Sequence, residues 1–514
     1  MPLTRESVWF ASVLLRTGRP TAADTAWRIM RRVLPTQKTA LWSRWRGLFP
    51  VRADRDPTDE DHDINWAEFM SEALLDVADA AGSRMPVDLV KATDAALRRA
   101  LAFMAPRDLG RQWHNLQALH TSVVLRAAAR FRDPALFVRA SARIDTLAEI
   151  VLRRQDRSEY NSPTYLWVAL ASLRAASAPT RGTVNGPKLD AIRAVICEDL
   201  RKRYRLDMGE LAGPYSRAYS VRLSDWLRDA LEAELTDCAR LLRPAAPVPR
   251  NWVVVDTFSR AETGALPERT YLGGTLDVVA TTWGAPMVSV GSISVGDFWS
   301  QRVPYLLLVG NRARHSSLRI RFLRNGTDYS GAQWFASQSA GEILAAIVLV
   351  TDGGGDHPHR ILKDGGAGTR DLRLRLEFSG DLPLPDPVPL NNPTRPFSFP
   401  FGGERLVVEV PAVRFGTSGP AWIRSDSAGL RRLDLVLRPA EKPPVAIAEL
   451  GRAALVLRLL VDSGVGSVAP AQIDSATEGC LAVTAGTLSM AVPDVPRTLA
   501  ALHSARGDSR CHTR

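Results

Sequence analysis

The chain has 514 residues, of which 45% are hydrophobic and 24% are charged. This length exceeds one ordinary domain and this composition supports true hydrophobic cores, so we expect two or three folded domains and exclude wholesale disorder. The net charge of +11 favours anionic partners, although an Arg-rich surface without a specific partner explains the same surplus equally well.

Residues 5–240 show one amphipathic helical pattern after another, with apolar side chains at helical spacing. The predicted helices cover 21–34, 65–77, 113–128, 133–151, 163–176, 187–204 and 221–238. Short connections without strand patterns favour pairs of antiparallel helices. A ring of such pairs, called an (α/α) toroid, is one solution, and a superhelical stack is another, but no fixed sequence period marks a repeat array.

Alternating patterns replace the helical ones after a Pro-rich stretch at 243–251. They predict strands at 252–255, 276–282, 305–309, 318–323, 344–350, 372–378, 405–410, 421–424, 432–437, 454–461 and 481–484. Strands at this spacing, with turn residues between them, indicate an antiparallel sandwich. We therefore expect a multidomain α and β protein: a helical toroid at 1–242, an antiparallel β-sandwich at 252–381, and a further β-sheet domain or a continuation of the sandwich at 401–500.

The four cysteines, Cys197, Cys238, Cys480 and Cys511, are scattered, so the sequence indicates neither a disulfide framework nor a Cys-based zinc site. Cys197 and Cys238 fall in helical patterns and are expected to be buried, small apolar residues. We find no signal-type core with a cleavage site and no apolar run long enough to span a bilayer. The expectation is a soluble, cytoplasmic protein without membrane contact, with secretion left open.

A polar segment at 159–165 interrupts the helical pattern and carries Glu159, Tyr160 and Tyr165. Its central residues, 161–163, suit a helix start with Pro at the first position, which explains them without any chemistry. That explanation leaves the acidic and aromatic side chains unaccounted for. Loops that carry several polar groups on a helical scaffold are where binding and catalysis concentrate, so we take these three residues as candidate ligand contacts.

A second polar segment places Tyr215, Arg217 and Tyr219 at alternate positions after a Gly-Pro turn. In an extended chain this spacing puts all three side chains on one side. Tyrosine and arginine also serve commonly as amphipathic packing, so a structural role is the alternative. His114 and Asn115, near the start of a predicted helix, are the other candidates for a polar cleft.

One His-containing loop in the β-rich half could bind a divalent metal through Asp356, His357 and His359. A Gly-rich turn with incidental polar residues is the stronger explanation, because short His tracts are only a compositional signal. Phosphate-binding Gly loops, HExxH zinc helices and nucleophile elbows are missing from the sequence. No nucleic-acid reading motif accompanies the basic charge, so we expect no nucleic-acid partner.

The order of helical ring, linker and antiparallel sandwich resembles the polysaccharide lyases of the (α/α) toroid type, such as heparinase II/III-like and alginate-lyase-like enzymes. The segments that carry this resemblance are His114-Asn115, the Tyr-rich 159–165 and 215–219, and two stretches that look like sandwich strands, 298–302 and 318–322.

The resemblance implies β-elimination on an anionic, uronate-containing oligo- or polysaccharide, with no required cofactor. Donors must stabilise charge on the uronate carboxylate as the neighbouring proton leaves, and a tyrosine beside a cation can act as base and acid. The catalytic candidates are Tyr219, Tyr215 and His114. The candidate substrate contacts are Asn115, Arg217, Glu159, Tyr160 and Tyr165.

Two alternatives stay open. A toroid glycoside hydrolase needs two carboxylates facing one cleft, for which Glu159 is the leading candidate and Asp63 or Asp225 the second. A non-catalytic glycan-binding or scaffold protein is equally compatible with the architecture, because one fold hosts many functions. The sequence leaves the oligomeric state open.

Overall fold

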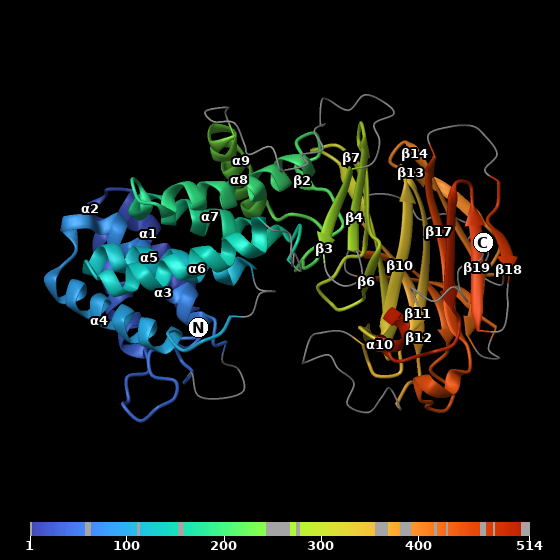
Figure 1. Cartoon of the computed structure of the whole chain (residues 1–514), viewed down its shortest axis with the longest axis horizontal. Helices are drawn as coiled ribbons and strands as arrows, with labels where there is room; N and C mark the ends of the chain where they lie inside the picture. Colours follow the sequence, from blue (N-terminus) through green and yellow to red (C-terminus); the bar gives the residue numbers. More distant parts are fainter. Residues whose placement is uncertain are drawn as a thin grey trace. The chain divides into compact units, whose positions relative to one another are not determined.

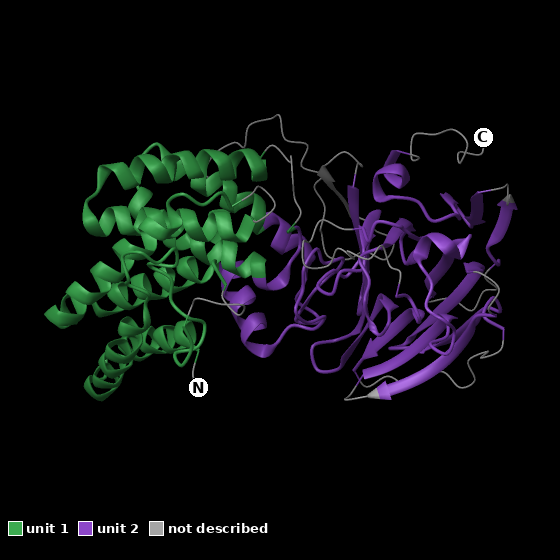
Figure 2. Ribbon diagram, turned by 90° about the horizontal axis from the view of Figure 1, so that it is seen from below, with its two compact units in different colours: residues 1–159, 165–197, 237–242 green, residues 160–164, 198–236, 243–514 purple. Residues whose placement is uncertain are grey.

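The computed structural model in Figure 1 divides into two compact units, which Figure 2 colours separately. It describes residues 3–56, 63–109, 114–152, 159–242, 268–273, 278–354, 368–380, 392–415, 419–427, 430–462, 469–475 and 479–504. Unit 1 comprises Met1–Glu159, Tyr165–Cys197 and Asp237–Leu242, and unit 2 comprises Tyr160–Thr164, Glu198–Thr236 and Arg243–Arg514. The segment 198–236 therefore belongs to the β-rich unit, whereas the predicted boundary at 242 assigned it to the helical domain.

Helices that alternate between an inner and an outer row build unit 1. In chain order they are α1 (Thr4–Arg16), α2 (Pro20–Val33), α3 (Trp66–Ala81), α4 (Val87–Met104), α5 (His114–Phe131), α6 (Pro134–Leu152), α7 (Pro163–Thr180) and most of α8 (Asn185–Arg203). α9 (Asp225–Leu241) begins in unit 2, and only its C-terminal end belongs to unit 1. α1, α3 and α5 pack on one another in turn, and they pair with α2, α4 and α6. This is the alternation of an (α/α) toroid, as the sequence predicts.

The inner and outer helices differ in how many of their side chains are buried. In α5 every side chain from Asn115 to Ala128 is buried, as expected for an inner helix enclosed by neighbours. α2 buries only one stripe, which consists of Ala26, Trp27, Met30 and Val33. The periodicity of the sequence located these helices correctly because the buried stripe of an outer helix repeats at helical spacing.

Cys197 and Cys238 form a disulfide between α8 and α9, with their Cα atoms 5.4 Å apart. The expected burial of the two residues is confirmed, but the sequence did not indicate their disulfide. Both are buried, but the sequence separation of 41 hid their pairing, because only the tertiary structure brings the two helices together. The chain passes from unit 1 to unit 2 directly after Cys197 and returns at Asp237, so the disulfide closes the base of the segment 198–236.

Unit 2 is an antiparallel sandwich. Within the described ranges, a nine-stranded sheet has the order β15-β16-β12-β8-β7-β5-β4-β3 with β9 beside β8, and a six-stranded sheet has the order β13-β14-β17-β11-β10-β6. The nine-stranded sheet contains β3 (Glu268–Gly273), β4 (Val278–Ala285), β5 (Val288–Ile293), β7 (Tyr305–Gly310), β8 (His315–Arg324), β9 (Thr327–Asp328), β12 (Leu372–Ser379), β15 (Ala421–Ser427) and β16 (Leu430–Arg438). The six-stranded sheet contains β6 (Val295–Asp297), β10 (Ala332–Ser339), β11 (Glu342–Leu349), β13 (Phe397–Phe401), β14 (Glu404–Phe415) and β17 (Ala453–Asp462).

Strands that are far apart in the β-rich region are neighbours in each sheet, so β13 to β17 continue the sandwich, whereas the later strands form a sheet of their own. Leu318, Ile320 and Phe322 of β8 point into a core shared with the other sheet. A second core lies under a three-stranded sheet of β18 (Gln472–Ser475), β19 (Cys480–Ala485) and β20 (Leu488–Pro493), next to α10 (Leu499–Ser504). The prediction of a strand at 318–323 is confirmed.

The expected strand at 298–302 is instead a turn. The Asp297 carboxylate accepts a hydrogen bond from the Trp299 N–H at 2.9 Å, and the Arg302 N–H donates to the Trp299 carbonyl at 2.7 Å. A side chain that bonds to the backbone two residues later turns the chain out of an extended conformation. The predicted strand at 252–255 lies outside the described residues.

The segment 204–223 crosses the outer face of the nine-stranded sheet at close range. A Cβ atom on Gly291 of β5 would lie 2.0 Å from the Gly213 carbonyl oxygen, and one on Gly213 would lie 2.5 Å from Leu306 Cβ. Glycine at both positions allows this backbone to approach the strands. The short pair β1 (Tyr204–Arg205) and β2 (Glu210–Leu211) belongs to the same segment.

Candidate active site in unit 2

The second tyrosine segment runs extended along the loop before β7. The Tyr215 N–H donates to the Val303 carbonyl and the Val303 N–H donates back to the Tyr215 carbonyl, each at 3.0 Å. The Ala218 N–H donates to the Gln301 carbonyl at 2.7 Å. These bonds fix the path of the segment and decide which of its side chains face solvent.

Asn161 and Ser162 hold this segment from the first polar segment. Asn161 has a φ of 50°, in the left-handed region that asparagine tolerates better than most residues. Its Nδ2 group donates to the Ala212 carbonyl at 2.6 Å and to the Pro214 carbonyl at 2.7 Å. Ser162 Oγ donates to the Arg217 carbonyl at 2.5 Å. The prediction explained these residues as a helix start, and it missed their role in joining the two polar segments.

Tyr215 has the environment of a structural residue. It is 2% exposed, and its hydroxyl donates to the Leu211 carbonyl. Burial, together with the negative charge of Glu210, raises the pKa of Tyr215 well above its usual value. Each of these properties opposes formation of a phenolate, so the surroundings of Tyr215 disfavour its predicted role as the base.

The three alternating side chains do not share one environment. Tyr219 is 66% exposed, in contrast to the buried Tyr215. The guanidinium of Arg217 lies 5.2 Å from the ring centre of Trp299, and its Nε donates to Gln301 Oε1 at 3.1 Å. The structure therefore places Arg217 on the turn at 298–302, where it packs against an aromatic ring.

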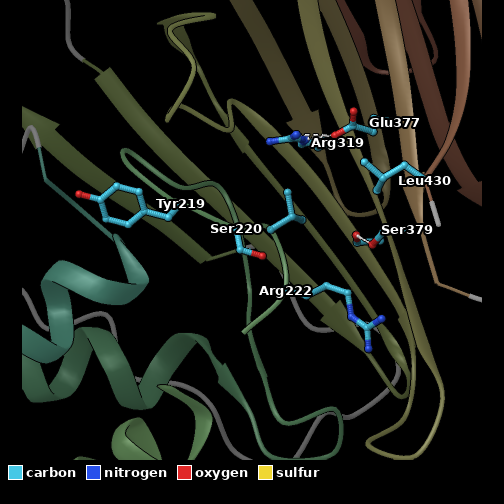
Figure 3. Close-up of a pocket in the computed structure, with 9 residues that line it drawn as sticks. Tyr219, Ser220, Arg222, Arg319, Glu377, Ser379 and Leu430 are labelled. Carbon is cyan, nitrogen blue, oxygen red and sulfur yellow. Dashed lines mark hydrogen bonds and ion pairs between the residues drawn. The ribbon is translucent and has the colours of Figure 1, made fainter. Parts of the chain in front are cut away.

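Tyr219 stands at the rim of a pocket of about 220 Å³ between the segment and the strands (Figure 3). The pocket is lined by Tyr219, Ser220, Val221, Arg222, Ser317, Arg319, Glu377, Ser379 and Leu430. Figure 3 shows the Tyr219 ring projecting outward from the segment.

One wall of the pocket is an ion-pair cluster on the outer face of β8 and β12. Arg319 Nε donates to Glu377 Oε1 at 2.6 Å, and Arg321 Nη1 donates to Glu377 Oε2 at 3.1 Å. Burial alone would raise the pKa of Glu377, but the charges of Arg319 and Arg321 outweigh it, and the pKa lies below its usual value. The carboxylate of this wall is thus ionised and neutralised by its neighbours.

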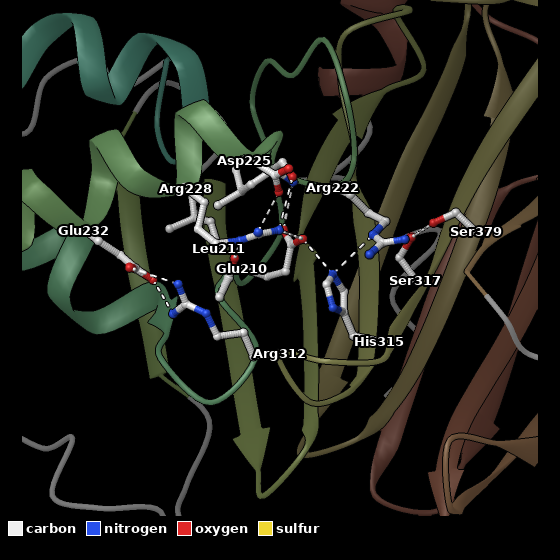
Figure 4. Close-up of polar contacts among 12 residues, drawn as sticks. Glu210, Leu211, Arg222, Asp225, Arg228, Glu232, Arg312, His315, Ser317 and Ser379 are labelled. Carbon is white, nitrogen blue, oxygen red and sulfur yellow. Dashed lines mark hydrogen bonds and ion pairs between the residues drawn. The ribbon is translucent and has the colours of Figure 1, made fainter.

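The opposite wall carries Arg222, behind which a buried carboxylate and imidazole pair lies (Figure 4). His315 Nε2 is 2.7 Å from Glu210 Oε1, and Arg222 Nε is 3.2 Å from the same His315 nitrogen. Neither Glu210 nor His315 was singled out by the sequence, since they stand far apart in the chain and belong to no motif. Arg222, Arg319 and the two serines, Ser317 and Ser379, were also missed.

The remaining predicted residues of the helical half lie mainly in unit 1. The Asn115 backbone N–H and side-chain Nδ2 donate to the two carboxylate oxygens of Glu159, at 2.8 and 2.6 Å. A carboxylate at the first turn of α5 caps the helix, and its negative charge interacts favourably with the positive end of the helix dipole. Both residues are nearly buried, and this contact gives them a structural role.

His114 begins α5 and Tyr165 lies in the first turn of α7, both in unit 1. Tyr160 belongs to unit 2, where the Arg203 guanidinium stacks on its ring at 4.5 Å from the centroid. His114 and Asn115 therefore belong to a different unit from Tyr219, and the predicted cleft between these two sets of residues stays a prediction.

The predicted metal loop, with Asp356, His357 and His359, lies outside the described residues. Within the ranges that the structure describes, no cluster of His, Cys, Asp and Glu side chains is arranged to hold a metal ion. In the same ranges, no helix has both the length and the apolar character needed to cross a bilayer.

Residues 2–229 match a family model described as "Domain of unknown function (DUF8769)". No curated protein matches the chain. Among solved structures, the chain is similar to a heparinase III (TM-score 0.41, 10% identity, covering 84% of this chain and 73% of that one). It is also similar to a mutant heparan sulfate lyase from Pedobacter heparinus (TM-score 0.41, 9% identity, 96% and 82% covered). A third is a Paenibacillus xanthan lyase (TM-score 0.45, 10% identity, 96% and 58% covered).

These three similar structures are polysaccharide lyases, the group that the sequence resembles.

Proposed function

We propose that the chain is a polysaccharide lyase that cleaves an anionic, uronate-containing glycan by β-elimination at the pocket beside Tyr219. One observation carries the proposal: an exposed tyrosine stands at the rim of a pocket that also presents two guanidinium groups, Arg222 and Arg319. A proton acceptor and cations that stabilise a carboxylate are the groups that this reaction requires.

In this reaction the Tyr219 phenolate takes the proton from the carbon next to the uronate carboxylate. The electron pair of the broken C–H bond forms a carbon–carbon double bond, and the bond from the next carbon to the glycosidic oxygen breaks. The leaving oxygen then takes a proton from the Tyr219 phenol. Negative charge spreads onto the carboxylate in the transition state, where a guanidinium stabilises it more than in the ground state.

The hydrolase alternative is supported less well, because it needs two carboxylates across one cleft. Both oxygens of Glu159 accept hydrogen bonds from Asn115. The side chain of Asp225 is 94% exposed and pairs with Arg228 at 2.8 Å. Each of these predicted carboxylates already has a structural partner.

A non-catalytic glycan-binding protein is the second candidate. The paired charges on β8 and β12 favour it, because a polar face with satisfied ion pairs can bind sugar hydroxyls without any chemistry. Binding of a glycan with no bond cleavage would identify this function.

The test is incubation of the protein with a panel of uronate glycans while ultraviolet absorbance is followed in the band of the unsaturated uronate. New absorbance indicates a lyase, and new reducing ends without absorbance indicate a hydrolase. Tyr219→Phe should lower the elimination rate by about 100-fold or more, the usual contribution of a general base. Tyr215→Phe is the matched control, because it removes the same atom from a buried site. Full activity in Tyr219→Phe would refute the assigned role.

We also propose that the protein works in an oxidising compartment. The Cys197–Cys238 disulfide supports this, because such bonds persist in exported proteins and are reduced in the cytosol. Fractionation of the native host, with detection by antibody, tests this proposal. Recovery of the protein only from the cytosol, with free thiols, would contradict it.

A further inference from the structure

A buried pair of side chains stands directly behind Arg222 in the pocket wall. The side chains of Glu210 and His315 are 0% and 2% exposed, and they meet at 2.7 Å through Oε1 and Nε2. The other carboxylate oxygen of Glu210 accepts the Leu223 N–H at 2.9 Å. The pair therefore lies in a rigid setting between β2, β8 and the segment that carries Arg222.

One nitrogen of His315 faces two competing partners. Its Nε2 is 2.7 Å from the Glu210 oxygen and 3.2 Å from Arg222 Nε. A ring nitrogen has a single in-plane position, which holds either a proton or a lone pair. The shorter contact is to a carboxylate, and a bond to an ionised acceptor is the stronger one. These contacts favour a proton on Nε2 that is donated to Glu210.

This assignment leaves Arg222 without an internal acceptor. With a proton on His315 Nε2, the Arg222 Nε–H meets another N–H instead of a lone pair. Among the residues that the structure describes, Arg222 makes no ion pair, and His315 is its one hydrogen-bond contact. Arg319 differs, because Glu377 already neutralises it. Among the described residues, the pocket thus contains one arginine that forms an ion pair, Arg319, and one that forms none, Arg222.

The chemistry of the other lining groups is compatible with an anion. Glu377 is the carboxylate of the pocket, and Arg319, Arg321 and Arg432 all pair with it. Ser317 and Ser379 lie 2.6 Å apart through their hydroxyl oxygens, so they offer hydroxyl groups beside the cation. Figure 4 shows His315 between Glu210 and Arg222.

We propose that Arg222 is the anion-binding residue of this pocket, positioned by the Glu210–His315 pair, and that the pocket takes a carboxylate or sulfate substituent of a sugar. The inference deepens the proposed function, on which the identity of the ligand as a glycan rests. Because His315 Nε2 donates its proton to Glu210, it does not accept a hydrogen bond from Arg222. The N–H donors of the Arg222 guanidinium can therefore bind the ligand. Its planar fork suits both kinds of oxyanion.

Calorimetric titration tests the proposal in a Tyr219→Phe background, where binding is separated from turnover. The probes are a glucuronate-containing disaccharide, its methyl ester and a sulfated neutral disaccharide. Arg222→Gln should weaken binding of the charged probes by about 10- to 100-fold, the loss typical of one charged hydrogen bond. Arg314→Gln, at an exposed arginine in the connection between β7 and β8, should leave affinity within about twofold. The two charged probes distinguish a carboxylate from a sulfate site.

Binding measurements on His315 variants test whether this histidine positions Arg222. His315→Leu should weaken binding in the presence of Arg222 and have no further effect on Arg222→Gln, because the histidine acts through the arginine. His315→Gln keeps an N–H for Glu210 and should restore most of the affinity. Equal binding of the methyl ester and the acid, together with binding of the sulfated probe that does not depend on Arg222, would overturn the anion site. Additive losses would overturn the positioning role. Retained, Arg222-dependent binding without any elimination in the parent protein would refute the proposed lyase and leave this inference standing.

Discussion

Removal of the Cys197–Cys238 disulfide should destabilise the protein through its unfolded state. The bond closes a loop with a sequence separation of 41. In the chain-entropy description, a cross-link of this span lowers the conformational entropy of the unfolded state and raises its free energy by about 4 kcal/mol at 25 °C. The double variant, Cys197→Ser with Cys238→Ser, should therefore lower the free energy of unfolding by about 3 to 4 kcal/mol. Each serine replaces a buried sulfur atom.

Guanidinium unfolding with and without a thiol reductant measures this effect. The parent protein should shift to a lower midpoint on reduction, and the double serine variant should shift by less, because Cys480 is also disulfide-bonded. Circular dichroism follows the helices of unit 1, and the change should be larger in that signal than in a probe of the sandwich. A midpoint that is insensitive to reductant, in protein whose thiols are shown to be free, would refute the reasoning.

Three further outcomes follow from single residues. Burial, with repulsion from Asp76, raises the pKa of Glu72 from 4.5 to about 7. The resulting stability is present below pH 4.5 and is lost as pH rises through 7, so Glu72→Gln should stabilise the protein by about 1 to 3 kcal/mol at pH 8 and by little at pH 4. Thermal melts at both pH values check the sign, and an equal gain at both would contradict it. Asn161→Ala should cost about 2 to 3 kcal/mol, since two hydrogen bonds and a favourable left-handed residue are lost. Asn161→Gly should regain only the part of this free energy that comes from the left-handed backbone conformation, and chemical unfolding measures the difference. Tyr215→Phe should cost about 1 to 2 kcal/mol in unfolding experiments because a buried carbonyl loses its donor, and no loss would mean that water replaces the hydroxyl.

Much of the fold could be predicted from local patterns in the sequence. Helical spacing located α2, α3 and α5, and alternation located β7, β8 and β12, because each element buries one stripe or one face. The turn at 298–302 was mistaken for a strand. Its aromatic residues favour strands, but the hydrogen bond from the Trp299 N–H to the Asp297 carboxylate overrides that preference.

The candidate site followed from the sequence only in part. Tyr219 was singled out because a tyrosine beside a turn is visible in one short segment. The spacing rule also grouped Tyr215 with it, and only the pairing of that residue with Val303 shows that Tyr215 is buried. Asn161 was explained as part of a helix start, since its hydrogen bonds to the second polar segment depend on contacts far apart in the chain.

The sequence by itself determined the order of helices and strands and the segment that carries the exposed tyrosine. Only the tertiary structure decided that Cys197 pairs with Cys238 and that Arg222 shares a pocket with Arg319 and Glu377. The physical reason is that periodicity records which side of an element is buried, a property of neighbouring residues. Disulfides, ion pairs and pockets depend on which elements pack together, and no local pattern records that choice.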